Sequence, residues 1–433
     1  MCARKSESGV DIPFERLRLD NGLRVVLSQD ASAPVVAVNL WYNVGSRNER
    51  EGRTGFAHLF EHMMFQGSAN VPEMAHFALI EQAGGSLNGS TWLDRTNYFE
   101  TLPSHYLELG LWLESDRLGW LLPAMTQEKL DNQRDVVKNE RRWRVDNQPY
   151  GDWDERLQAM LYPADHPYHH SVIGSMEDID AASLEDVEQF FRTYYAPNNA
   201  VLSLVGDFDS ALAPDLVDRY FGEIPRGPEV PPIPGRTALP SLLGEEVRDT
   251  VSQDISLARV YQAYRIPPYG SDEFYAALVA SFVLGWGRAA RLYRTLVRER
   301  QLAQDVVTYA FPIVVGSSML VTWATARPGV DVDVLENAMT EQMEALAAAN
   351  DADVERAIAL IDARNLADLQ TVDERADQLS MHTTLFDDPG RVNTELARVR
   401  AVTTADVRAF AGDFLRRDNR AVLRYVPRNN GAQ

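Results

Sequence analysis

Residues 54–66 read TGFAHLFEHMMFQ, and the spacing of their apolar residues predicts an amphipathic helix. With an advance of about 100° per residue, one helix face collects Phe56, Leu59, Phe60, Met63 and Met64. The polar residues His58, Glu61 and His62 cluster on the other face, where the simplest alternative role is solvation. Because the two histidines stand one turn apart, their rings can bind one cation together. Glu61 projects beside them, where a carboxylate can take a proton from metal-bound water.

A catalytic zinc site usually needs a third protein ligand, and the predicted helix at 127–144 offers one. One face of this helix, at spacings of 3, 4 and 3, carries Leu130, Gln133, Val137 and Glu140. A carboxylate on a face that packs against the core is costly unless a cation pairs with it. Glu140 is therefore either a metal ligand or one half of a buried salt bridge with Arg134 or Arg141.

The chain divides near its middle at a segment rich in proline and glycine, IPRGPEVPPIPGRTALP at 224–240, which predicts a linker. Residues 183–204 and 403–424 share one order of features, namely a capped amphipathic helix, a turn with asparagine and an apolar strand. Their offset of 220 residues predicts two homologous domains. The expected parts are an N-terminal domain, a linker and a C-terminal domain without a metal motif, at 1–225, 226–240 and 241–433.

Alternating strand and helix patterns predict an α+β fold. The first half opens with LRLDNGLRVVLS (17–28), which contains an Asn21-Gly22 hairpin turn, and VVAVNLWYNVGS (35–46). Helices are predicted at 54–66, 73–83, 104–119, 127–144, 272–284, 288–300, 330–348 and 351–369, and further strands near 256–265 and 305–325. Each domain should therefore be a mainly antiparallel sheet with helices packed on one face.

Composition excludes several classes of protein. A formal net charge of -21 argues against nucleic-acid binding, and an acidic interior would favour basic peptides. Cys2 is the only cysteine, so neither an intrachain disulfide nor a thiolate metal site can form. No apolar run approaches the roughly 18 residues that a membrane span needs. We expect a cytoplasmic protein, with a periplasmic location as the alternative if a leader has been removed.

Several stretches resemble the inverzincin family of pitrilysin, insulin-degrading enzyme and the mitochondrial processing peptidase. They are GSRNEREGRTGFAHLFEHMMFQGS (45–68), GGSLNGSTWLDRTNYFETLP (84–103), RDVVKNE (134–140) and HPYHHSVIG (166–174). The family combines an H-x-x-E-H motif with a glutamate ligand further along the chain, and here 77 residues lie between His62 and Glu140. The length resembles that of the short subunits that form half of a clam-shell chamber.

The resemblance implies one zinc per chain, with His58, His62 and Glu140 as ligands and Glu61 as the general base. It also implies that the segment with Asn88 and Thr91 forms an edge strand. A peptide substrate would add to that strand through main-chain hydrogen bonds.

Two departures from the family pattern concern groups outside the zinc motif. Gln133 stands where the family commonly carries a second glutamate, so it can support a ligand or water only through hydrogen bonds. In the C-terminal half, Arg298 fits the family's substrate-binding arginine. The tyrosine expected seven residues later is replaced by Gln304 or Asp305, and Tyr309 is too far along. We therefore expect a homologous subunit without zinc to supply an Arg/Tyr pair, in a heterodimer or a dimer of heterodimers.

These features predict the catalytic subunit of a zinc metalloendopeptidase that hydrolyses peptides or small unfolded polypeptides inside a closed chamber. Glu61 would activate zinc-bound water. The alternative is a non-catalytic assembly subunit that resembles the core proteins of the respiratory chain's third complex. The complete metal motif favours the enzyme, whereas Gln133 and Gln304 favour the alternative.

Overall fold

The computed structural model describes residues 9–428, which form two compact units. The first unit comprises the described residues up to Arg141, His170–Pro234 and Leu366–Glu395. The second unit comprises Arg142–His169, Gly235–Asn365 and the described residues from Leu396 onward. The expected boundaries were 1–225, 226–240 and 241–433. Residues 142–169 instead group with the second unit, and residues 366–395 group with the first. Cys2 lies outside the described residues.

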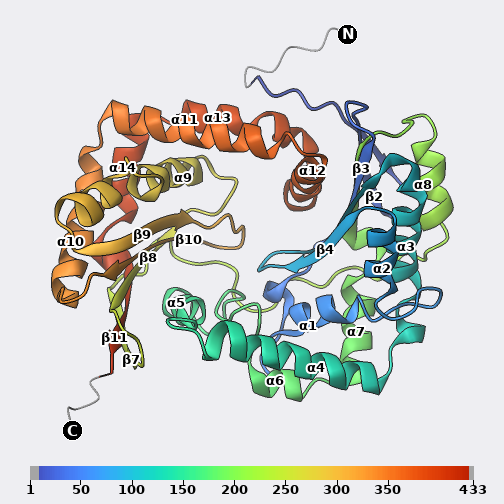
Figure 1. Ribbon diagram of the computed structural model, residues 1–433, viewed down its shortest axis with the longest axis horizontal. Helices are drawn as coiled ribbons and strands as arrows, with labels where there is room; N and C mark the ends of the chain where they lie inside the picture. Colours follow the sequence, from blue (N-terminus) through green and yellow to red (C-terminus); the bar gives the residue numbers. More distant parts are fainter. Residues whose placement is uncertain (1–8, 429–433) are drawn as a thin grey trace. The chain divides into compact units, whose positions relative to one another are not determined.

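The first unit contains a six-stranded sheet in the order β1-β2-β6-β3-β5-β4. Strands β2, β3 and β4 of this sheet are labelled in Figure 1. Its strands are β1 Glu15–Arg18, β2 Arg24–Gln29, β3 Val35–Tyr42, β4 Ser86–Thr91, β5 Thr96–Pro103 and β6 Ala200–Gly206. Its helices are α1 Phe56–Met63, α2 Ala75–Gln82, α3 Leu107–Trp120, α4 Gln127–Arg141, α6 Met176–Asp180, α7 Leu184–Tyr194, α8 Ala213–Phe221 and α12 Val372–Phe386.

The second unit contains a five-stranded sheet in the order β7-β11-β8-β10-β9. Its strands are β7 Val247–Gln253, β8 Arg259–Ile266, β9 Ala303–Ala310, β10 Ser318–Ala326 and β11 Arg420–Pro427. Its helices are α5 Trp153–Leu161, α9 Asp272–Gly285, α10 Val332–Glu344, α14 Thr404–Phe414 and, for the most part, α11 Asp351–Asp368 and α13 Glu395–Ala401. The helix predicted at 288–300 includes a π-helical segment, Tyr293–Glu299.

The two sheets have the same strand order, which confirms the prediction of two homologous α+β domains. Strands β2, β6, β3, β5 and β4 correspond in order to β7, β11, β8, β10 and β9. In each sheet the first pair of that series is parallel and the pairs after it are antiparallel. Both sheets are thus mixed but mainly antiparallel.

The internal repeat seen in the sequence is also structural. Ser183 and Thr403 each form a capping box at the start of a helix, α7 and α14 respectively. The buried Asn199 donates to the carbonyl of Tyr194 (2.8 Å), and the buried Asn419 donates to that of Phe414 at the same distance. Each asparagine therefore fixes the turn from a helix into a central strand, which explains the shared pattern.

The two faces of the first sheet carry different layers. Apolar residues of the strands pack with helices on one face, in a core that includes Leu111, Leu118, Leu202, Leu204, Val217 and Phe221. Ser203 points to the opposite face because side chains alternate along β6. There the Ser380 hydroxyl on α12 donates to the Ser203 hydroxyl (2.8 Å), and α12 lies beside β3 in Figure 1. A helix from late in the chain therefore covers part of the second face, beyond the single helical layer that we predicted.

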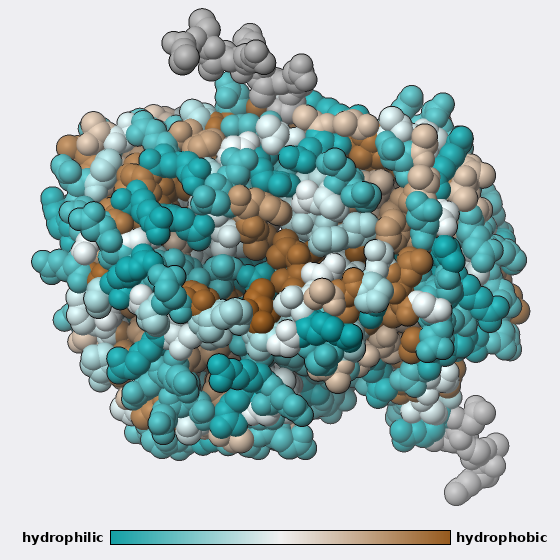
Figure 2. All heavy atoms as spheres, turned by 180° about the vertical axis from the view of Figure 1, so that it is seen from behind, coloured by the Kyte–Doolittle hydropathy of each residue, from teal (hydrophilic) through white to brown (hydrophobic). Residues whose placement is uncertain are grey.

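No helix in residues 9–428 is long and apolar enough to cross a membrane. Seen from behind, most of the surface is hydrophilic, and exposed apolar side chains form smaller patches (Figure 2).

Replacing His382 on α12 by phenylalanine should make the stability of the protein less sensitive to acid. Burial, together with the nearby Arg391, lowers the pKa of His382 to about 3, and the side chain is 1% exposed. A histidine in the unfolded chain titrates near pH 6.5, so the stability contributed by neutral His382 is present above about pH 6.5 and lost toward pH 3. The loss between pH 7 and pH 4 should be on the order of 3 kcal/mol.

Urea midpoints measured from pH 4 to pH 8 in the presence of EDTA would test this prediction without a contribution from metal release. His382→Phe should show a shallower decline in the midpoint on acidification than the parent protein. His105→Gln changes an exposed histidine and should leave the decline unaltered. Equal declines for His382→Phe and the parent protein would contradict the assigned pKa.

Candidate metal centre

Helix α1 begins at a point that two glycines and one buried carboxylate define. Gly55 has φ of 85° before the first helical residue, and a Cβ on Gly174 would lie 2.3 Å from the Gly55 nitrogen. Glu49 accepts the N–H groups of Gly55 (2.9 Å) and Ala57 (2.7 Å), so its carboxylate satisfies donors that a helix start leaves open. The His170 ring lies 2.9 Å from the same carboxylate. These contacts set where His58 stands.

The two faces of α1 behave as its sequence predicts. Its apolar residues Phe56, Leu59, Phe60 and Met63 are buried. The side chains of His58 and His62 remain 13% and 23% exposed, and their ring centroids lie 4.9 Å apart. The imidazoles therefore reach the same small volume outside the core.

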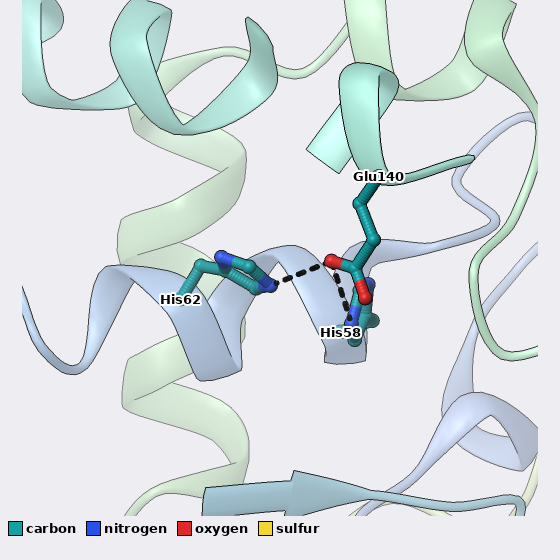
Figure 3. A group of neighbouring side chains, drawn as sticks. All are labelled: His58, His62 and Glu140. Atoms are coloured by element: carbon teal, nitrogen blue, oxygen red, sulfur yellow. Dashed lines mark ion pairs between the residues drawn. The ribbon is translucent and has the colours of Figure 1, made fainter. Parts of the chain in front are cut away.

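Helix α4 brings Glu140 to the two histidines (Figure 3). One Glu140 oxygen lies 3.3 Å from Nε2 of His62 and 3.7 Å from Nε2 of His58. Leu130, Gln133 and Val137 are buried on the same helix, as the predicted stripe requires. Of the two arginines in the salt-bridge alternative, Arg134 forms an ion pair with Asp131, and Arg141 donates to the Gly174 carbonyl (2.6 Å).

The donor set fits a zinc ion. Zinc held at about 2.0–2.2 Å by tetrahedral ligands separates neighbouring donor atoms by about 3.4 Å. The two measured N···O separations, 3.3 and 3.7 Å, bracket that value. Ligand atoms of His58, His62 and Glu140 all lie within 4.8 Å of one another, a grouping that no other set of three such side chains in residues 9–428 achieves. Two imidazoles and one carboxylate are also a usual ligand set for catalytic zinc.

Glu61 stands at the wall of a pocket beside this group. Burial raises the pKa of its carboxyl, although a hydrogen bond from the Thr91 hydroxyl acts in the opposite direction. The pocket has a volume of about 360 Å³ and is lined by Glu61, His62, Phe65, Gln66, Met74, Phe77, Gln133 and Val136. Gln133 thus lines the same pocket as Glu61 and His62, and its supporting role stays a prediction.

Comparison with known proteins agrees with this geometry. The family model described as Insulinase (Peptidase family M16) matches residues 24–165, and that described as Peptidase M16 inactive domain matches residues 181–361. The zinc protease PqqE of Helicobacter pylori is 30% identical over 333 residues, which cover 77% of this chain and 74% of the relative. The chain belongs to the M16 peptidase family. The resemblance seen in the sequence is thereby confirmed.

Solved structures of the same fold extend over nearly all of this chain. The crystal structure of a protease from Helicobacter pylori superposes with a TM-score of 0.90 at 26% identity, covering 96% of this chain and 100% of that one. A chain of complex III2 from Candida albicans has a TM-score of 0.78 at 16% identity, covering 95% of each chain. The latter likeness shows the fold alone.

Strand β4 of this M16 chain is an edge strand, as predicted. It lies at the end of its sheet and is paired with β5. Asn88 is exposed there, and its side-chain oxygen accepts the Gly89 N–H (2.9 Å). Thr91, by contrast, is engaged with Glu61 through its hydroxyl. Substrate binding by Asn88 and Thr91 stays a prediction.

The second M16 unit carries the remaining predicted residues. Arg298 lies exposed at the end of the π-helical segment. On β9, Gln304 falls at a register shift, Asp305 accepts a hydrogen bond from Thr325 (2.9 Å), and the Tyr309 side chain is exposed. Gln304 and Asp305 therefore occupy the position where a tyrosine is expected, and Tyr309 lies further along the strand. A substrate-binding role for Arg298 stays a prediction.

Two residues near the M16 metal group had no signal in the sequence analysis. One is Glu49, which accepts hydrogen bonds from the start of α1 and contacts the His170 ring. Arg95 is the other: it donates to the Ser90 carbonyl (2.8 Å), lies over the Trp41 ring (5.3 Å) and interacts electrostatically with Glu61. Each also has partners distant in sequence, His170 for Glu49 and Trp41 and Glu61 for Arg95, which no local pattern indicates.

Proposed function

We propose that this chain is the zinc-binding catalytic subunit of a metalloendopeptidase. The observation that carries the proposal is the meeting of His58, His62 and Glu140, with Glu61 on the same helix as the histidines. Membership of the M16 family and similarity to a protein named as a zinc protease support it.

In the proposed reaction each residue of the site has a separate role. Zinc, when bound, supplies Lewis-acid chemistry that brings the pKa of a coordinated water toward 7. The Glu61 carboxylate takes a proton from the attacking water and passes it to the leaving amine. The free edge of β4 holds the main chain of the peptide by added hydrogen bonds, and Gln133 orients groups beside Glu61. The substrates are peptides or small unfolded polypeptides within a chamber of which this chain forms half.

A homologous subunit completes the site in this proposal. Gln304 or Asp305 occupies the position where a tyrosine is expected, so the chain by itself lacks one group that holds the substrate carbonyl. The partner carries an Arg/Tyr pair and no zinc motif, and it assembles with this chain as a heterodimer or a dimer of heterodimers. We further propose a cytoplasmic location, with the periplasm as the alternative.

A non-catalytic assembly role is the second candidate. Gln133 in place of a glutamate favours it, and so does Gln304 or Asp305 in place of the expected tyrosine. An assembly subunit, however, does not need a complete metal site. This chain has all three candidate ligands, His58, His62 and Glu140, and the candidate base Glu61. The enzyme is therefore the better-supported function.

Zinc content and cleavage of a quenched-peptide library would test the proposal. We expect one zinc per purified chain by atomic absorption, slow cleavage by the chain alone and loss of all cleavage with a chelator. Co-expression with a homologous half-length subunit that carries Arg and Tyr should raise the rate by about 10²–10³-fold, the usual contribution of a preorganised donor. Protein without zinc or cleavage would support the assembly role, and full activity of the chain alone would remove the partner from the proposal.

A further inference from the structure

The position of His58 depends on the start of α1. The helix is only eight residues long, from Phe56 to Met63, and His58 is its third residue, opposite Glu140 (Figure 3). The first turn of a helix leaves N–H groups without partners inside the helix, and helix ends fray unless other groups accept those bonds. Gly55, at the N-cap, has no side chain that could do so. The cap of α1 therefore has to come from elsewhere in the chain.

Glu49 supplies that cap through both of its carboxylate oxygens. Oε2 accepts the N–H of Gly55 (2.9 Å), and Oε1 accepts the N–H of Ala57 (2.7 Å), the residue directly before His58. The Glu49 side chain is 0% exposed, so bulk water does not compete for these two N–H groups. A carboxylate in such a place is costly unless a second group balances it.

His170 is that second group. Its Nε2 lies 2.9 Å from Oε2 of Glu49 and 3.1 Å from the Ser46 carbonyl oxygen. Burial acts to lower the pKa of His170, but the hydrogen bond and the charge of Glu49 outweigh it and raise that pKa, so the ring can donate to the carboxylate. His170 belongs to the segment HPYHHSVIG (166–174), which no step of the proposed reaction uses. Its contact with Glu49 connects His170 to the metal centre.

We infer that Glu49 and His170 are positioning residues for zinc, which hold the first turn of α1 so that His58 stands where zinc binding requires it. The inference rests on the proposed function, because it takes zinc binding by His58 from there. Both residues act through the backbone at Ala57 and are not themselves ligands. His62 lies one turn further along α1, so its position depends less on the cap. The pair should therefore affect the contribution of His58 to zinc binding more than that of His62.

Zinc dissociation constants, measured by competition with a chromophoric chelator, test this inference without any turnover. In Glu49→Gln, one of the two N–H groups faces an amide donor, so we expect zinc to bind about tenfold more weakly, at the lower end of the range for partners that support a ligand. Asp406→Asn is the matched control, because Asp406 caps α14 in the second unit, and it should leave the zinc affinity unchanged. A zinc affinity of Glu49→Gln equal to that of the parent protein would overturn the inference.

A double-mutant cycle separates a positioning role from a general loss of structure. In a His62→Ala background, where His58 still binds zinc, Glu49→Gln should again weaken binding by about tenfold. In a His58→Ala background, the same substitution should change the zinc affinity by about twofold or less, because the residue that Glu49 positions is absent. Equal losses in the two backgrounds would mean that Glu49 only stabilises the fold, and would overturn the inference.

Substitutions of His170 keep the inference testable if Glu49→Gln does not fold. The side-chain amide of glutamine can place a donor near the position of the imidazole Nε2, so His170→Gln should bind zinc within about twofold of the parent protein. His170→Phe has no donor and should bind zinc about fivefold more weakly. Urea midpoints in the presence of EDTA would show that both variants are folded. Equal zinc affinities of the two variants would overturn the inference.

These measurements also separate the inference from the proposed function. If the parent protein binds no zinc, the metal assignment and the inference both fail. If zinc binding responds to Glu49 and His170 as expected but no peptide is cleaved, the positioning role stands and the catalytic proposal fails. If peptides are cleaved but Glu49→Gln binds zinc as the parent protein does, only the inference fails.

Discussion

Glu61→Gln should lower the rate of peptide cleavage by about 10²–10⁴-fold and leave one zinc bound per chain. Glutamine has nearly the same shape as glutamate but cannot accept the proton that the attacking water must lose. The carboxyl lies at the wall of the pocket next to His62 and accepts a hydrogen bond from Thr91. Burial raises the pKa of Glu61, which makes it a better proton acceptor once ionised than an exposed carboxylate.

The measurement compares kcat and zinc content for the assembled enzyme with and without the substitution. Glu81→Gln makes the same chemical change at an exposed position on α2 and should leave both quantities unchanged. Loss of zinc from Glu61→Gln would instead place Glu61 among the ligands. A near-normal rate would exclude it as the general base.

Glu140→Gln should weaken zinc binding by more than about 100-fold, because even partners that only support a ligand contribute 10–100-fold. The carboxylate supplies the negative charge in the donor set, whereas an amide oxygen is neutral and binds zinc weakly. At free zinc about 100 times the parent Kd, the parent protein should gain about 2.7 kcal/mol of stability. Glu140→Gln, with a Kd at least 100-fold higher, should gain about 0.4 kcal/mol or less.

Isothermal titration with zinc and thermal unfolding with and without zinc would check this expectation, and circular dichroism would show that the fold is intact. Glu128→Gln is the matched control, because Glu128 is exposed on the same helix. If Glu140 served a salt bridge with arginine rather than the metal, its replacement would leave zinc binding as it is in Glu128→Gln. That result would contradict the ligand assignment.

Features that depend on local periodicity could be predicted from the sequence. The opposed faces of α1 follow from the placing of Phe56 and Leu59 against His58, and the stripe on α4 leads to Glu140. The capped helices before the two asparagine turns repeat at a fixed offset, so the two homologous domains could also be predicted. On each helix the residues concerned lie on successive turns, so backbone geometry alone sets which side chains share a face.

The sequence by itself thus determined the M16 family, the α+β class and the residues able to hold the metal. Only the tertiary structure decided what surrounds them. Asp377 receives a hydrogen bond from Asn97, 280 residues away, and Glu49 holds the start of α1 through a bond geometry that Gly174 permits. The structure likewise decided that residues 142–169 group with the second unit and residues 366–395 with the first. Partners for buried polar groups are selected by the packing of distant elements, and hydrophobic periodicity carries no information about which elements meet.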